Sequence, residues 1–423
     1  MTGNAGTVER GNAKMQDDMV QSGQAVDLKG MTLDELEGFA ERLGEPRYRG
    51  RQIAHWLYQR GATSFSEMTD LPAALRARLV EEADVTPLTP LTSVTADGGD
   101  TIKYLVQLSD DATIETVFMR YQDGRRSVCV STQVGCGMGC TFCATGLAGL
   151  TRNLTAAEIL DQVILVQRLT GERVSNVVFM GMGEPLANYE ATLRAVNLLN
   201  APYGLGIGMR HLTVSTVGLV PQIRRLASER LQLTLAVSLH APVDELRSEL
   251  VPVNRRWPVA ELLDASRDYV RETGRRISFE YVLMETVNDT PELAATLGEL
   301  LRARSEGVTA EDDGALPFHV NLIPWNPVYG LQYRRPGRDR VEAFVWELRA
   351  RGVPATVRLE RGVDIDAACG QLQRTRGAAT VLATDGNTGT PTHATRARGG
   401  ARERGNAAGK DVRSVASKQS ERG

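Results

Sequence analysis

Three cysteines stand close together in the sequence, Cys136, Cys140 and Cys143, with the spacing C-x3-C-x2-C. Three thiolates are one fewer than the four that complete a structural zinc site or fully ligate a 4Fe-4S cluster. A cluster on these residues would keep one iron open to a small chelating molecule with an amine and a carboxylate. The alternatives are a zinc ion completed by a distant Cys or His, and cysteines that pack in the core, although structural zinc more often uses two C-x2-C pairs.

The other two cysteines, Cys129 and Cys369, also occupy positions that suit a reactive thiol. In the strand around Cys129, two serines share the face of the cysteine and two valines share the other face. In a barrel, the polar face would be the interior; the alternative is a small buried hydrophobe, the usual role of a lone strand cysteine. Cys369 precedes Gly370 in a loop that could carry its thiol to a barrel mouth, and its alternative role is fourth ligand of the cluster.

Four polar residues come just after predicted strands: Glu184, Ser215, His240 and Asn326. In parallel α/β barrels, chemistry is found at the carboxyl ends of the strands. Glu184 follows Gly183 in a turn of small residues that lets the backbone approach a ligand. The Glu184 carboxylate could accept a hydrogen bond from an amino group of that ligand. His240 alone would more often be a satisfied core histidine, but its strand-end position beside Ser238 favours a functional role.

The elements that position these residues follow from the apolar pattern. Beyond residue 126, apolar strands alternate with longer helical segments, which predicts parallel pairing in an open sheet or a full or partial barrel. The expected strands lie near residues 127–132, 175–180, 211–217, 232–239, 277–284, 318–323 and 355–360. A period-two pattern predicts antiparallel entry strands at 91–95, 102–108 and 113–120. We therefore expect an α/β barrel domain at residues 91–373.

A small helical domain is expected before the barrel, at residues 29–90. Thr32 and Glu35 form a capping-box signature ahead of apolar residues at helical spacing, and further helical patterns follow at 48–60 and 71–82. Four arginines are candidates for phosphate contacts, with a solvated helix face as the alternative: Arg47, Arg49, Arg51 and Arg60. Residues 1–28 and the basic tail 374–423 are polar without apolar periodicity, and we expect both to be disordered.

The composition limits the class of protein. The 423 residues are 42% hydrophobic, enough for a packed core, and contain no run of about 18 apolar residues that could span a membrane. Five cysteines, three of them clustered, make a poor disulfide framework and suit a reducing compartment, so we expect a cytoplasmic protein. The net charge of -3 gives no global attraction to nucleic acid, so any RNA binding would depend on local patches.

The cysteine motif, with Phe142 directly before its last cysteine, resembles the signature of radical S-adenosylmethionine (SAM) enzymes. Five segments are similar to the RlmN family of RNA adenine-C2 methyltransferases, over a match that runs from about residue 30 to residue 372. They are CVSTQVGC (129–136), MGMGEP (180–185), SLHAP (238–242), NLIPWNP (321–327) and DIDAACGQL (364–372). Only the two tails and a short insertion around Glu311–Gly314 lie outside this match.

The resemblance implies a partial (β/α)6 radical SAM barrel with one 4Fe-4S cluster on Cys136, Cys140 and Cys143, and two SAM molecules per turnover. It also implies which residues line the SAM site: Gly183, Glu184, Ser215, Ser238, Leu239, His240 and Asn326. The implied partners are 23S rRNA and tRNA, at adenosine 2503 and adenosine 37 in family members, and an external reductant for the cluster and a disulfide. We expect a monomer, no membrane partner, and a flipped or bulged target base.

The resemblance further implies a radical mechanism, which avoids the poor nucleophilicity of adenine C2. Cys369 takes a methyl group from one SAM, and an adenosyl radical from a second SAM abstracts hydrogen from that S-methyl group. The carbon radical adds to C2 and forms a covalent protein–RNA adduct. Loss of the C2 proton, for which Glu115 matches the family's proton acceptor, and a Cys129–Cys369 disulfide release the methylated RNA. The strand pattern alone would place Glu115 toward solvent.

Two other functions remain open from the sequence. A Cfr-type enzyme would methylate C8 of the same adenine with similar cysteine roles, and CTFCATG (140–146) also resembles that type. Glu184 with Pro185, and the WNP triplet that ends at Pro327, favour the C2 enzyme instead. The more distant alternative is a non-catalytic RNA-binding protein with a structural metal.

Overall fold

The computed structural model describes residues 26–85, 87–308, 316–358, 361–372 and 380–381. The segments expected to be disordered, 1–28 and 374–423, lie mostly outside this part of the chain. Where they overlap with it, the expectation was wrong: Val26–Asp27 forms strand β1 and Thr380–Val381 forms strand β15. Val26 and Leu28 are buried, so these residues belong to the folded core despite their polar neighbours in the sequence.

The three helices predicted near the start are confirmed. The Thr32 side chain accepts the Glu35 N–H at 3.4 Å, and the Glu35 carboxylate accepts the Thr32 N–H at 2.7 Å, which completes the capping box. A short parallel strand pair closes this region, because β1 pairs with β2. The elements are α2 (Leu33–Arg42), α3 (Tyr48–Ala54), the π-helix η1 (His55–Gln59), η2 (Phe65–Glu67), α4 (Ala73–Glu82) and β2 (Ala83–Asp84).

The arginines of the helical region bond mainly to its own side chains. Arg47 and Arg51 both reach the Glu37 carboxylate, at 2.6 and 2.7 Å, and the Glu37 side chain is only 5% exposed. Arg49 lies 3.8 Å from a Glu45 oxygen. Arg47 and Arg51 therefore compensate a buried carboxylate and stabilise the contact between α2 and α3, a role that neither sequence interpretation included.

An 11-stranded mixed sheet organises the rest of the described chain, in the order β14-β13-β12-β11-β10-β9-β6-β5-β4-β3-β15. The seven strands from β14 to β6 are parallel to their neighbours, whereas β5, β4, β3 and β15 pair antiparallel. The order is open at both edges, and six strand–helix units precede β14. The predicted partial (β/α)6 barrel with antiparallel entry strands is confirmed.

The strands coincide with those predicted from the apolar runs. The antiparallel strands are β3 (Thr89–Ala96), β4 (Thr101–Gln107) and β5 (Thr113–Arg120). The parallel strands are β6 (Arg126–Cys129), β9 (Asn176–Phe179), β10 (Leu212–Thr216), β11 (Thr234–Ser238), β12 (Ile277–Leu283), β13 (Phe318–Pro324) and β14 (Ala355–Val357). The main helices between them are α6 (Ala156–Thr170), α7 (Tyr189–Asn200), α8 (Val220–Ser228), α9 (Asp244–Leu250), α10 (Val259–Thr273), α11 (Pro291–Ser305) and α12 (Arg338–Ala350).

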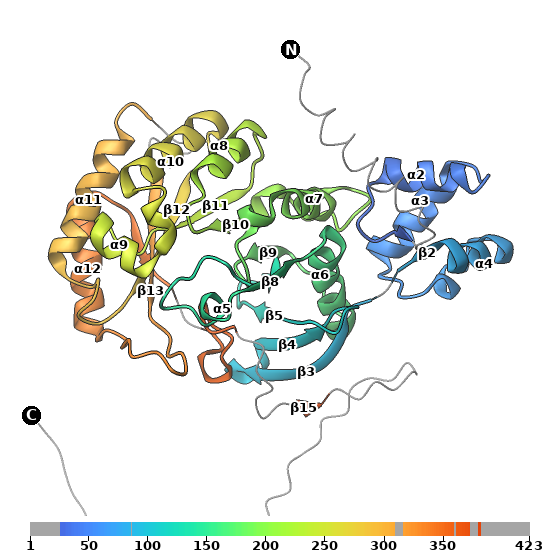
Figure 1. Cartoon of the computed structure of the whole chain (residues 1–423), viewed down its shortest axis with the longest axis horizontal. Coiled ribbons are helices and arrows are strands. Elements are labelled where there is room, and N and C mark those ends of the chain that lie inside the picture. Colours follow the sequence, from blue (N-terminus) through green and yellow to red (C-terminus); the bar gives the residue numbers. More distant parts are fainter. Residues whose placement is uncertain (1–25, 86, 309–315, 359–360, 373–379, 382–423) are drawn as a thin grey trace, which may run out of the picture. The chain divides into compact units, whose positions relative to one another are not determined.

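The two faces of the parallel sheet have different composition, because alternate residues of a strand point to opposite sides. The outer face lies under helices such as α8, α10 and α11 (Figure 1), and most of its residues in the central strands are at most 1% exposed. These include Val128, Val177, Val214, Val237, Phe279 and Val320. Strand register places polar residues together on the opposite side, which we call the inner face: Cys129, Thr213, Ser238, Glu280 and Asn321.

Candidate active site

The loop of Cys136, Cys140 and Cys143 is shaped by a glycine. It follows strand β7 (Gln133–Gly135), which forms a hairpin with β8 (Leu150–Asn153), and it leads into the short helix α5 (Ala144–Leu147). Gly135 has φ 83°, and a Cβ there would lie 2.0 Å from the Gly149 carbonyl oxygen. That carbonyl accepts the Cys136 N–H at 2.9 Å, so only glycine allows the hairpin to hold the first cysteine.

The three cysteines of the loop lie near one another, and each is half-buried. Burial raises the pKa of Cys136 to about 11, and it also raises the pKa values of Cys140 and Cys143. The Cys143 and Cys136 charges raise the pKa of Cys140 further. The thiols would therefore stay protonated without a cation, and the irons of a cluster would supply that charge. Among the described residues, no three His, Cys, Asp or Glu converge on a single ion, whereas thiolates on different irons of a cluster need not converge.

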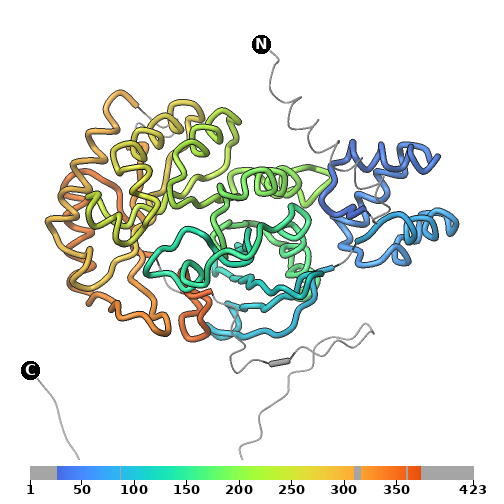
Figure 2. Tube along the Cα trace, in the orientation of Figure 1, coloured from blue at the N-terminus to red at the C-terminus, as the bar shows by residue number. Residues whose placement is uncertain are grey.

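The segment that carries Cys369 is attached to the cluster loop. The Ala144 N–H, one residue after Cys143, donates to the Gly370 carbonyl at 2.9 Å, and the Thr145 hydroxyl donates to the Leu372 carbonyl at 2.6 Å. Figure 2 shows this segment, in orange-red, beside the antiparallel strands of the sheet. Its start is held there by the Gly362 N–H, which donates to Asp97 of the β3–β4 turn at 3.0 Å. The structure thus places Cys369 between the cluster loop and the inner face.

Cys129 lies on the inner face, as predicted, within electrostatic range of Cys369. It is 8% exposed, and burial, followed by the Cys369 charge, raises its pKa to about 12. Arg358, which sequence reasoning missed, lies beside both thiols: the Cys369 thiolate, followed by Glu280, raises the pKa of Arg358. The arginine also donates to the Met180 sulfur at 3.8 Å. Arg358, which is half-buried, therefore lies within electrostatic range of both cysteines.

Glu115 is buried, which corrects the solvent-facing position that the strand pattern alone suggested. Its side chain is 1% exposed and bonds to Lys103 Nζ at 3.0 Å, a residue that sequence reasoning also missed. The register pairs Val117 of the same strand with Cys129, so Glu115 and Cys129 share the inner face. The Ser131 hydroxyl donates to the Glu115 carbonyl at 2.6 Å and fixes β5 against the chain that leads to the cluster loop. The C-terminal segment covers this region, and for that reason the carboxylate does not face solvent.

Glu184 joins the turns after β9 and β10. Its carboxylate accepts the Leu186 N–H at 3.0 Å and the Val217 N–H at 2.7 Å, and it also bonds to the Thr216 hydroxyl. Burial raises the pKa of Glu184 to about 7. A carboxylate has about four acceptor positions, so these three donors leave room for one more, such as a ligand ammonium.

The turn before Glu184 approaches β7, the strand that leads into the cysteine loop, closely. Gly183 has φ 105°, and a Cβ there would lie 2.6 Å from the Gln133 Cβ. The Gln133 side chain in turn accepts the Glu184 N–H at 2.9 Å. Gly183 therefore permits a contact between two loops, which is consistent with the tight turn inferred from the sequence.

His240 is a neutral ring at the end of β11. Its Nδ1 accepts the Val282 N–H at 3.1 Å, and burial lowers its pKa to about 3, so the ring hydrogen is on Nε2. The ring packs edge-on against Phe142 of the cluster motif, with centroids 4.8 Å apart. His240 has φ 61°, an unusual backbone conformation for a side chain of this size. The adjacent Leu239 has its side chain in the core and its N–H bonded to the Glu280 carbonyl at 3.0 Å.

Asn326 contains an orphaned acceptor. The residue is 3% exposed, its Nδ2 donates to the Cys369 carbonyl at 3.4 Å, and its Oδ1 has no hydrogen-bond partner among the described residues. The Thr132 hydroxyl, near the cluster loop, is also buried without such a partner. A polar ligand bound here would give these atoms hydrogen-bond partners. Together with three clustered thiols, they fit a 4Fe-4S cluster and a polar small molecule such as SAM.

Ser215 and Ser238 are half-buried on the inner face, at the ends of β10 and β11. These strand ends are held by Arg247, a fully buried residue that sequence reasoning missed. Its guanidinium donates to the carbonyls of Val217, Ser238 and Leu239 at 2.7 to 3.0 Å. Arg247 fixes the spacing of the strand ends and is a scaffold residue, because its donors are used by the protein itself.

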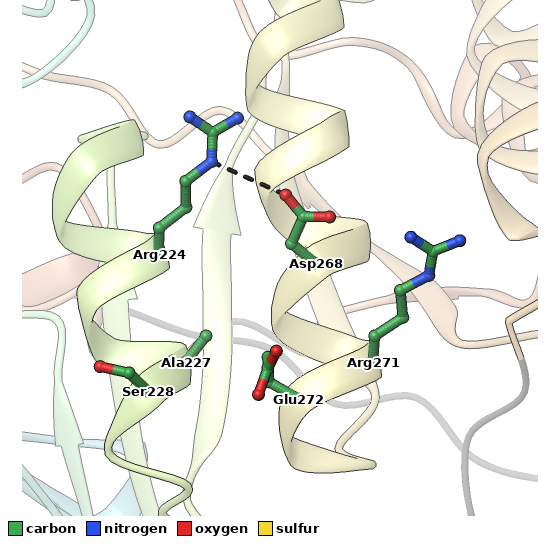
Figure 3. Close-up of a pocket in the computed structure, with 6 residues that line it drawn as sticks. All are labelled: Arg224, Ala227, Ser228, Asp268, Arg271 and Glu272. Atoms are coloured by element: carbon green, nitrogen blue, oxygen red, sulfur yellow. Dashed lines mark ion pairs between the residues drawn. The ribbon is translucent and has the colours of Figure 1, made fainter.

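A surface hollow lies elsewhere, between α8 and α10 (Figure 3). Its lining residues are Arg224, Ala227, Ser228, Asp268, Arg271 and Glu272. Arg224 and Asp268 form an ion pair across it at 3.7 Å. Both helices belong to the outer layer, so this hollow does not contain the inner-face residues described above. In the described part of the chain, no helix is long and apolar enough to span a membrane.

Two family models match the chain, one in each of the two regions described above. The model "Ribosomal RNA large subunit methyltransferase N-terminal domain" matches residues 26–85, and the model "Radical SAM superfamily" matches residues 130–297.

Relatives resemble most of the chain. The "Probable dual-specificity RNA methyltransferase RlmN" of Pelotomaculum thermopropionicum is 53% identical over 352 residues, which cover 83% of this chain and 92% of the relative. The protein of the same name from Parafrankia sp. is 52% identical over 362 residues, which cover 82% of this chain and 91% of the relative. The crystal structure of a radical SAM methyltransferase from Sphaerobacter thermophilus is 52% identical, with a TM-score of 0.77, and covers 83% of this chain and 100% of that one.

Proposed function

The chain belongs to the RlmN family of radical SAM RNA methyltransferases, and from this premise we propose that it methylates C2 of adenine in RNA. The proposed substrates are 23S rRNA, at adenosine 2503, and tRNA, at adenosine 37. The relatives' printed description as dual-specificity RNA methyltransferases supports a substrate range of more than one RNA.

The proposed cofactors are one 4Fe-4S cluster held by Cys136, Cys140 and Cys143, and two SAM molecules per turnover. When bound, the cluster and SAM would supply a 5'-deoxyadenosyl radical. The proposed SAM site consists of Gly183, Glu184, Ser215, Ser238, Leu239, His240 and Asn326. Glu184 would accept the SAM ammonium at its remaining position, and Asn326 Oδ1 would accept a ligand N–H. Leu239 would contribute only through its backbone position, because its side chain packs in the core.

The proposed catalytic residues are Cys369, Cys129 and Glu115. Cys369 accepts a methyl group on its sulfur and then carries the carbon that becomes bonded to adenine C2. Glu115 accepts the C2 proton from the resulting adduct. Cys129 attacks the Cys369 sulfur, the carbon–sulfur bond breaks as the disulfide forms, and the released carbon takes up the Cys129 proton to become the methyl group. The methylated RNA leaves, and the unpaired electron of the adduct would return to the bound cluster. An external reductant then restores the two thiols.

One observation carries this proposal: Cys129 and the buried Glu115 carboxylate share the inner face, and the segment of Cys369 bonds both to the cluster loop and to Lys103 beside Glu115. Burial, and the neighbouring charge of Cys369, raise the pKa of Cys129, while Arg358 offers both thiols a cation. A zinc-dependent RNA-binding protein would have no use for two additional thiols and a buried carboxylate in this position. We propose that residues 29–90 form an accessory domain that contacts RNA, and that the protein acts as a monomer.

The test compares Cys369→Ala with Cys129→Ala, in proteins expressed in cells and purified under anaerobic conditions. We expect Cys369→Ala to purify without linked RNA, because it has no methyl carrier. Cys129→Ala should trap the covalent adduct, because the resolving thiol is missing. Equal RNA content in the two variants would contradict these roles.

Nucleoside analysis of RNA treated with the reconstituted wild-type enzyme tests the regiochemistry. We expect 2-methyladenosine. The detection of 8-methyladenosine instead would favour the Cfr-type alternative, and the absence of any methylated adenosine despite SAM cleavage would contradict the proposed reaction.

A further inference from the structure

The inner face contains a buried ion pair at the proposed proton acceptor. Lys103 Nζ lies 3.0 Å from Glu115 Oε1, and the two side chains are 9% and 1% exposed. Lys103 comes from β4 and Glu115 from β5, and the register places Leu105 directly across from Glu115. Lys103 therefore reaches Glu115 diagonally across two neighbouring strands. A lysine that is removed from water in this way would be costly without a partner.

The same ammonium makes a second contact, to the segment that carries Cys369. Lys103 Nζ donates to the Asp366 carbonyl at 3.1 Å, three residues before Cys369. The Ala367 N–H donates to the Gly362 carbonyl at 2.9 Å, so Asp366 lies within a closed turn. One side chain thus connects the proposed proton acceptor to the loop of the proposed methyl carrier.

The chemistry of the step explains why such a cation is useful. A nearby cation favours the charged form of a buried carboxylate, and only the charged form can act as a base. We propose that Lys103 is a positioning residue for proton transfer, which keeps Glu115 charged inside the barrel and fixes it relative to the Cys369 loop. The inference rests on the proposed function. In this step the C2–H bond of the adduct breaks, the proton moves to a Glu115 oxygen, and the electron pair stays on the adenine.

The chain offers a matched control pair. Lys29 Nζ lies 2.8 Å from Asp161 Oδ1, with side chains 2% and 4% exposed, so this pair is as buried as the first one. Asp161 also accepts the Leu88 N–H at 2.8 Å, and Lys29 belongs to the start of the helical region, not to the inner face. The loss of Lys29 should therefore affect folding without a specific effect on proton transfer.

The experiment compares Lys103→Met and Lys29→Met in the full-length enzyme with its cluster. In Lys103→Met, we expect Cys369 methylation at the wild-type level, accumulation of covalent RNA adduct, and adduct release slowed by about 100-fold, the scale of a lost general base. Lys29→Met should lower the unfolding temperature and show no accumulation of adduct. Lys103→Arg retains the charge and should restore most of the release rate.

The outcomes separate the inference from the proposed function. If the wild-type protein forms neither adduct nor 2-methyladenosine, the proposed function fails. If the wild type is active and Lys103→Met releases the adduct at the wild-type rate, or loses Cys369 methylation instead, the inference is overturned. If Lys103→Met does not fold, Lys103→Ala with added propylammonium replaces it, and a lack of amine-dependent release then counts against the inference.

Discussion

The outer and inner faces of one parallel sheet are built on the same strands, yet they perform different tasks. Val237 is fully buried on the outer face, and its neighbour Ser238 is half-buried on the inner face. The outer residues are mostly apolar and pack against helices, with Thr216, opposite Val237, as an exception. The inner residues include hydroxyls, carboxylates, an amide and the thiol of Cys129.

This difference separates stability from chemistry along a single strand. Burial of apolar surface on the outer face stabilises the sheet and requires little more than the correct size and polarity. The inner face requires particular atoms at particular distances, such as the hydrogen bond of 2.7 Å between Asn321 and Glu280. Substitutions on the outer face should therefore lower the free energy of unfolding, whereas substitutions on the inner face should impair ligand binding or catalysis.

We expect the largest effect from a substitution at Gly135, the residue directly before the first cysteine of the loop. Gly135→Ala would place a Cβ 2.0 Å from the Gly149 carbonyl at φ 83°, so we expect loss of the cluster and of methylation. Gly137→Ala is the matched control, because the atom nearest to its Cβ would be Leu150 Cβ at an ordinary 3.6 Å. Cluster formation in the two variants is measured by their iron and sulfide content after anaerobic reconstitution. Equal cluster content in the two variants would contradict the role given to Gly135.

A second test uses the neighbouring pair on β11. Val237→Ala should lower the free energy of unfolding by about 2 kcal/mol, through lost burial and a cavity, and leave the KM for SAM nearly unchanged. Ser238→Ala should change stability little but raise the KM for SAM by about fivefold to tenfold, the scale of one hydrogen bond. Urea unfolding and SAM titration measure these quantities. If Ser238→Ala destabilises the protein as much as Val237→Ala, the division between the faces fails.

The smallest expected effect concerns His240, which lies at the inner edge yet is buried like a core residue. Its folded pKa of about 3 is below the ordinary 6.5, so between these values the unfolded chain binds the extra proton. Stability is therefore fully present above pH 6.5 and falls with decreasing pH, by at most about 1.4 kcal/mol per pH unit. His240→Asn tolerates φ 61° and keeps an acceptor for the Val282 N–H, but it does not titrate.

Unfolding free energies at pH 6.5 and pH 5 check this prediction. We expect a smaller decrease for His240→Asn than for the wild type. Equal decreases would show that His240 does not contribute to acid sensitivity.

The sequence predicted the strands, the three first helices and the cysteine loop, because each depends on local patterns of polarity, capping and glycine. It could not predict the surroundings of single charged residues in strands. Glu115 and Lys103 resemble solvent-facing residues until a segment 263 residues farther along the chain covers them. Arg358 was missed for the same reason, since Met180 and Cys129 lie far from it in the sequence. Arg247 was missed because a helix pattern does not show that an arginine turns inward to the carbonyls of neighbouring strand ends. The pair β1–β2 escaped prediction because a strand of two residues has no period.

Under the proposed function, the hydrogen bond from Ala144 to Gly370 would couple iron supply to the use of SAM. Ala144 follows Cys143, a proposed cluster ligand, and Gly370 follows Cys369, the proposed methyl acceptor, so a cysteine loop loosened by the lack of iron would also loosen the Cys369 segment. Under iron starvation we expect iron-free molecules to remain unmethylated at Cys369. They would not consume SAM in a modification that they could not pass on to RNA.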